Sequence, residues 1–190
     1  VAVNVTVPEA GITSIVFEML GGGDTVSVLG GSPGDVALTI NGGDGADSAI
    51  FSTAATDRGT GAISVSAETI TTTAQVEGGA VALTTDNLSI AAGITGTGEL
   101  TIVSQTAGRT IGLGGGAGDL NIDDAEIANI GGFTSATIGN TTAGDIEIDT
   151  ADFSMLVILQ TAGTITDVSD ADDDIGNDTS PIEGTVEPGG

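Results

Sequence analysis

Three short segments in the middle of the chain decide the fold: Ile63-Ser-Val-Ser-Ala67, Val81-Ala-Leu-Thr-Thr85 and Leu100-Thr-Ile-Val103. In each segment apolar and polar residues alternate, and Gly, Thr, Asp or Asn residues bound the run. This alternation is typical of half-buried β-strands, because successive side chains of a strand point to opposite faces. The starts of the segments are evenly spaced, and a repeat of about 20 residues indicates a solenoid of stacked coils.

Similar segments lie on both sides of this stretch, at residues 12–17, 25–29, 36–40, 120–123, 146–149 and 155–159. We take Leu120 and Ile146 as the starts of the next two coils, which makes these coils somewhat longer. The pattern therefore predicts an all-β parallel β-helix with coils of about 18–26 residues. An antiparallel β-sandwich is the alternative, because it also has regular short strands. Little helix is expected, apart from one or two turns within residues 123–130, capped by Asp123 or Asp124.

Composition divides the chain into three parts. Residues 1–60 form a Gly/Asp-rich segment of β-repeats, residues 61–167 contain the regular coils, and residues 168–190 form an acidic tail or linker. Seven stretches carry a more specific order of motifs: residues 66–70, 87–90, 96–102, 107–115, 120–130, 136–139 and 144–148. Together they resemble the repeat region of filamentous-haemagglutinin-like proteins, which are large bacterial surface and secreted proteins. The resemblance implies a right-handed parallel β-helix in an extracellular or cell-surface stalk or adhesin, and it carries no catalytic residues.

The charge of the chain restricts its partners. The sequence has 27 acidic and 2 basic residues, a net charge of −25, and no Cys or His. Arg58 and Arg109 are the two cations. A chain this acidic repels phosphate, so we expect neither nucleic-acid binding nor attachment to an anionic membrane. The longest apolar block, Met155 to Leu159, is far too short to insert into a membrane.

Residues 42–50 fit the calcium-binding nonapeptide Gly-Gly-x-Gly-x-Asp and resemble one repeat of the RTX type. Asp44 and Asp47 lie in this segment, and Asp24 belongs to a degenerate copy that begins upstream at Gly21. Since the two copies are separated by about one coil, Asp24 is expected to lie above or below Asp44 or Asp47. Carboxylate oxygens are ligands that Ca²⁺ prefers. An ordinary Gly-Asp turn between strands is the alternative.

A second acidic run, Asp170-Ala-Asp-Asp-Asp174, lies close to the end of the chain. Asp172 and Asp174 are candidate Ca²⁺ ligands at a junction to a following domain. A solvated linker is the alternative and the more common role of such a run. No other cofactor is expected.

These features favour a structural role over an enzymatic one. The chain has no Trp or Tyr, so it lacks the aromatic residues on which sugars usually stack. Its two Arg residues are too few to neutralise an acidic polysaccharide substrate. We expect a stalk or filament segment whose partners are further coils of the parent chain or copies of itself, stacked end to end. The alternative is a calcium-dependent adhesive module that binds a surface or a glycan.

Overall fold

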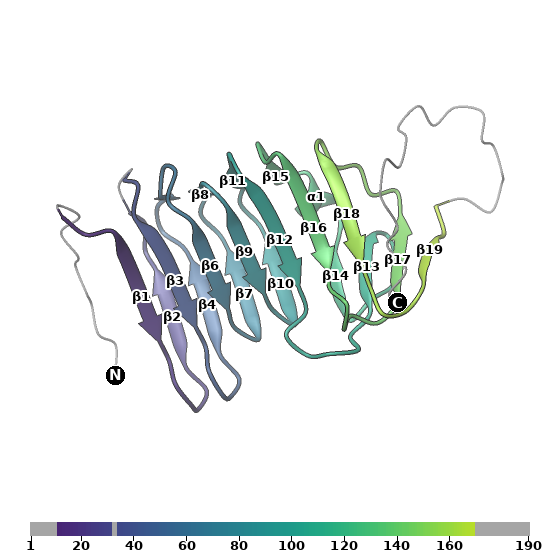
Figure 1. The fold of residues 1–190 in the computed structure, drawn as a ribbon, viewed down its shortest axis with the longest axis horizontal. Coiled ribbons are helices and arrows are strands. Elements are labelled where there is room, and N and C mark those ends of the chain that lie inside the picture. Colours follow the sequence, from purple (N-terminus) through teal and green to yellow (C-terminus); the bar gives the residue numbers. More distant parts are fainter. Residues whose placement is uncertain (1–10, 32–33, 170–190) are drawn as a thin grey trace.

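The computed structural model describes residues 11–31 and 34–169. The chain forms a parallel β-solenoid of about 7 turns with almost no helix (Figure 1). Every pairing between its named strands is parallel, so the antiparallel sandwich alternative is wrong and the predicted β-helix class is confirmed.

The strands are arranged in four sheets. The first sheet runs along the molecule in the order β1 (Ser14–Glu18), β3 (Ala37–Asn41), β6 (Ile63–Ser66), β9 (Val81–Thr84), β12 (Glu99–Val103), β16 (Ser135–Gly139) and β18 (Leu156–Gln160). The second sheet contains β2 (Thr25–Val28), β4 (Ser48–Phe51), β7 (Thr69–Thr72) and β10 (Asn87–Ile90). The third contains β5 (Thr56–Asp57), β8 (Val76–Gly78), β11 (Ile94–Gly96) and β15 (Ile130–Gly131). The fourth has the order β14 (Leu120–Ile122), β13 (Ile111–Gly114), β17 (Ile146–Asp149) and β19 (Ile165–Asp167).

The core is a set of apolar ladders inside the coils. In the first sheet one inward column reads Ile15, Leu38, Ile63, Val81, Leu100, Ala136 and Val157 in successive strands. A second column, two residues further along each strand, runs from Phe17 to Leu159. The central members of both columns are buried, whereas those of the first and last coils are only partly buried. Stacking each apolar residue on its equivalent in the next coil is the main stabilising contribution.

Coil length agrees with the prediction only in part. The inward residues Ile63, Val81 and Leu100 pair in successive coils, as their spacing predicted. The next partner of Leu100 in this sheet, however, is Ala136, so this coil is almost twice as long as the two before it. Leu120, the predicted continuation, begins β14 in the fourth sheet, and Ile146 begins β17 in that same sheet. The prediction that Leu120 and Ile146 start the next two coils after Leu100 is therefore wrong.

The long coil contains an additional strand, β13. It pairs with β14 on one side and with β17 on the other, although it precedes both in the sequence. Residues 115–119 return the chain from the end of β13 to the start of β14, and this segment lies directly against β13. A Cβ atom on Gly112 would lie 2.2 Å from the carbonyl oxygen of Gly116, and one on Gly118 would lie 2.0 Å from the nitrogen of Gly112. Only glycine permits this close approach.

The single turn of helix α1 (Asp124–Ile127) follows β14. Asp123, one of the two caps predicted from the sequence, is its N-cap, and it also forms a capping box with Glu126. The helix also completes the second sheet, because Oε1 of Glu126 accepts from the N–H of Ile90 at 2.9 Å. Nδ2 of Asn129 donates to the carbonyl oxygen of Ile90, also at 2.9 Å. Two side chains thus bind backbone groups of β10 that have no strand partner among the described strands.

Candidate functional sites: the acidic corner and the hollow beside β13

Four acidic residues stand in a row along one corner of the solenoid. Strands β2, β4, β7 and β10 start at Thr25, Ser48, Thr69 and Asn87, which are in register. The residue before each of them is acidic: Asp24, Asp47, Glu68 and Asp86. We call these four residues the acidic corner. It lies where the chain turns from the first sheet to the second, at the lower loops in Figure 1.

Carboxylates of the acidic corner accept hydrogen bonds from backbone N–H groups of neighbouring coils. The N–H of Asp24 donates to Oδ1 of Asp47 at 2.8 Å, and the N–H of Asp47 donates to Oε2 of Glu68 at 2.6 Å. Oδ1 of Asp86 accepts from the N–H groups of Gln105 and Thr106 at 3.0 and 2.9 Å. Hydrogen bonds to ionised acceptors are stronger than neutral ones, so the row fastens one coil to the next.

Within the acidic corner, the carboxylate of Asp86 has hydrogen-bond and ion-pair partners in Gln105, Thr106 and Arg109. Its burial opposes ionisation, but hydrogen bonds from the hydroxyl and N–H of Thr106, the charge of Arg109 and the N–H of Gln105 together hold its pKa below the usual value. Nε of Arg109 lies 3.6 Å from Oδ1 of Asp86. Nη2 of Arg109 donates to the carbonyl oxygens of Asp86 and Asp119, at 3.1 and 3.2 Å. Arg109 therefore fixes the point where the additional strand leaves the regular coils.

Asp47 contains an unusual buried oxygen. The residue is 1% exposed, and Oδ2 has no hydrogen-bond partner among the described residues. Gly42 leaves space beside it, because a Cβ atom there would lie 3.0 Å from both Asp47 Oδ2 and the carbonyl oxygen of Ser66. Buried carboxylate oxygens normally have a donor or a cation as partner.

The three residues predicted to bind Ca²⁺ near the start of the chain lie on two adjacent turns. Asp24 and Asp47 are brought together by their hydrogen bond. Asp44 is exposed on the same turn as Asp47, and its main chain pairs with Leu20 and Gly22. Over residues 11–31 and 34–169 no group of three or more acidic side chains is arranged to hold a metal ion. Calcium binding by Asp24, Asp44 and Asp47 therefore stays a prediction. Asp172 and Asp174 lie outside the described residues.

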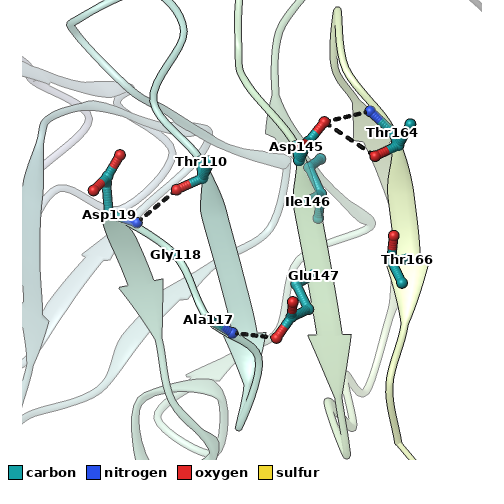
Figure 2. A pocket seen from close by; sticks show the side chains of 9 residues that line it. All are labelled: Thr110, Ala117, Gly118, Asp119, Asp145, Ile146, Glu147, Thr164 and Thr166. Carbon is teal, nitrogen blue, oxygen red and sulfur yellow. Dashed lines mark hydrogen bonds between the residues drawn. The ribbon is translucent and has the colours of Figure 1, made fainter.

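A shallow hollow of about 400 Å³ lies on the outer face of the fourth sheet (Figure 2). Its lining consists of Thr110, Ala117, Gly118, Asp119, Asp145, Ile146, Glu147, Thr164 and Thr166. Oδ1 of Asp145 accepts from the N–H and hydroxyl of Thr164 at 2.8 and 3.0 Å, and these bonds lower the pKa of Asp145. Oε1 of Glu147 accepts from the N–H of Ala117 at 2.8 Å.

The hollow is rich in oxygen acceptors and would therefore repel anions. Glu147 already binds the return segment 115–119, which stabilises the additional strand, and Asp145 binds Thr164, the residue before β19. Asp119, Asp145 and Glu147 were not predicted from the sequence. Their position before a strand could have indicated two of them. Asp119 directly precedes β14 and Asp145 directly precedes β17, just as each acidic-corner residue directly precedes its strand.

Comparison of the chain with protein-family models, curated protein sequences and solved structures finds no match. In the part of the chain that the structure describes, no helix is long and apolar enough to cross a membrane.

Proposed function

We propose that the chain is a structural segment of an extracellular bacterial surface protein, a stiff stalk or filament unit with no catalytic role. The observation that carries this proposal is the unbroken stacking of inward residues, from Ile15 to Val157 and from Phe17 to Leu159. Each coil satisfies the backbone groups of its neighbours and buries their apolar faces, as in other solenoids. The resemblance of residues 61–167 to filamentous-haemagglutinin-like repeats supports the extracellular location.

The distribution of charge supports the same role. The strands of the second sheet contain no acidic residue, and those of the seven-stranded first sheet contain only Glu18 and Glu99. The other described acids lie at corners, in α1, or on the third and fourth sheets. High net charge keeps an exposed fibre soluble and opposes lateral aggregation of its sheets. The proposed partners are further coils of the parent chain, and copies of the same chain are the alternative.

Stiffness can be tested directly, because the sequence has no Cys and accepts two unique spin labels. We suggest Ser27→Cys on β2 and Thr166→Cys on β19, both of which are exposed. Eight stacked strands at an inter-strand spacing of ~4.8 Å place these labels roughly 30–35 Å apart. Double electron–electron resonance should give one narrow distance distribution that does not change between low and high salt. A broad or salt-dependent distribution would overturn the stalk proposal.

The second candidate is a calcium-dependent adhesive module, in which Ca²⁺ orders the corner for binding to a surface or a glycan. The specific observation in its favour is Oδ2 of Asp47, a buried carboxylate oxygen with no donor among the described residues. Residues 42–50, with their resemblance to one RTX repeat, supply the sequence support.

Thermal unfolding followed by circular dichroism, with Ca²⁺ and with chelator at equal ionic strength, tests this candidate. A site filled at 100 times its Kd stabilises the fold by about 2.7 kcal/mol, which raises Tm by several degrees. Asp47→Asn should lose that shift. Asp152→Asn, which makes the same charge change at an exposed residue, should keep it. An unchanged wild-type Tm would rule the candidate out.

A further inference from the structure

The two ends of the described solenoid differ in their inward residues. At the N-terminal end, β1 and β2 present Ile15, Phe17, Val26 and Val28, all apolar and partly buried. At the C-terminal end, β18 presents Val157 and Leu159, and β19 presents Ile165.

Asp167 interrupts this apolar pattern at the C-terminal end. It pairs in register with Ile148, which pairs with Leu113, which in turn pairs with Ile122. Leu113 and Ile122 are buried and Ile148 packs on the core, so Asp167 occupies the fourth position of an inward apolar column. In the described chain it is exposed because no strand covers β19.

The carboxylate of Asp167 is held in its charged form. Oδ1 accepts from the hydroxyl of Ser169 at 2.5 Å and from its N–H at 2.9 Å. These two bonds lower the pKa of Asp167 against a small opposing effect of burial. The bonds also form a tight turn directly after β19. An inward charge on a terminal strand is a known means of preventing further strand pairing.

We propose that Asp167 is a charge stop, which prevents the β1–β2 end of a second copy of this chain from stacking on the β18–β19 end. The inference rests on the proposed structural function. All strands of both ends run parallel, so a copy stacked head to tail continues the same ladders without reversing direction.

The remaining positions of the two ends are complementary. Stacking β1 on β18 in the register of the first sheet places Ile15 over Val157 and Phe17 over Leu159, which continues both inward columns. Glu18 then faces Gln160. Inside the chain Oε1 of Glu18 already accepts from the amide Nδ2 of Asn41 at 2.7 Å, so the Gln160 amide offers a donor of the same kind to its other oxygen.

The match fails at one position. Stacking β2 on β19 brings Val26 and Val28, the two apolar inward residues of β2, against Ile165 and Asp167, the inward residues of β19. Pairing would then bury an ionised carboxylate against an apolar side chain, and such burial strongly disfavours association.

Sedimentation velocity over a concentration series at neutral pH tests the stop. Compared with the wild type, Asp167→Val should raise the association constant by roughly tenfold or more, and Asp167→Asn should raise it less. Asp152→Asn removes the same charge from an exposed residue and should leave association at the wild-type level. Adding Val26→Asp to Asp167→Val should abolish the gain, since it puts a new charge in the same interface.

The outcomes separate this proposal from the proposed function. If Asp167→Val stays as monomeric as the wild type, or if Asp152→Asn promotes association equally, the charge stop is refuted. A narrow spin-label distance in the same variant would then show that the stiff segment is intact. A broad distance distribution would instead count against the structural role itself.

Discussion

The main-chain N–H of Asp24 donates to Oδ1 of Asp47, one coil further along the same corner, at 2.8 Å. Replacing Asp47 by Ala removes this acceptor from a buried position and should lower the free energy of unfolding by about 1–3 kcal/mol. Chemical denaturation followed by circular dichroism measures the change. The matched control is Asp44→Ala on the exposed part of the same turn, with an expected effect within about 0.5 kcal/mol. Equal losses in both variants would mean that the corner hydrogen bond contributes nothing.

Gly112 in β13 is expected to be intolerant of any side chain. A Cβ atom there would lie 2.2 Å from the carbonyl oxygen of Gly116 and 2.8 Å from Nδ2 of Asn121. Because the nearest obstacle is backbone, Gly112→Ala should destabilise the fold by about 2 kcal/mol or more. Gly131→Ala is the control, since nothing lies within 4 Å of its Cβ position. The same denaturation experiment compares them, and similar stabilities would contradict the close packing of segment 115–119.

The two side chains that bind Ile90 should control the exchange of its amide. Glu126→Ala combined with Asn129→Ala leaves both backbone groups of Ile90 without their partners. Hydrogen exchange followed by NMR should then show faster exchange at Ile90, together with a loss of about 1–3 kcal/mol in stability. Glu126→Gln retains an acceptor oxygen and should preserve most of the protection. Unchanged exchange in the double variant would show that α1 does not complete the second sheet.

Asp86 should contribute stability that disappears in acid. Its pKa in the fold lies below the usual value of 3.8, so its contribution is complete above about pH 4 and is lost as the pH falls through the lowered pKa. Protonation of other carboxylates relieves repulsion over the same range, so the comparison must be made between variants. The difference in unfolding free energy between wild type and Asp86→Asn should be largest near neutral pH and should shrink below about pH 4. A constant difference would show that the charge of Asp86 is not linked to folding.

Much of the fold could be predicted from local pattern. The nine alternating segments of the sequence all fall on strands, because an inward apolar residue at every second position requires one buried face. Several strands were not foreseen, among them β8, β11, β15 and β19, which are only two or three residues long. Runs this short do not display an alternation that distinguishes them from turns.

The order of strands around β13 could not be predicted from periodicity. The segments that begin at Leu100, Leu120 and Ile146 have the same alternating pattern, so their spacing suggested three successive coils, whereas Leu120 and Ile146 both align with Ile111 of β13 in one sheet. The true arrangement depends on the tight glycine-rich return and on the bonds of Arg109 and Glu147 across the chain. The acidic corner was foreseen only at Asp24 and Asp47, because Glu68 and Asp86 lie in turns without the Gly-Gly motif.

The additional strand has a geometric consequence for any fibre made from this unit. After the coil that contains β9 and β10, the first sheet has three further strands: β12, β16 and β18. Over the same part of the chain the opposite wall has four strands: β14, β13, β17 and β19. One extra spacing of ~4.8 Å across walls ~10 Å apart turns the axis by roughly 25°. Copies joined end to end, as expected for the Asp167→Val variant, would therefore trace an arc or a superhelix, and the position of β13 would set its radius.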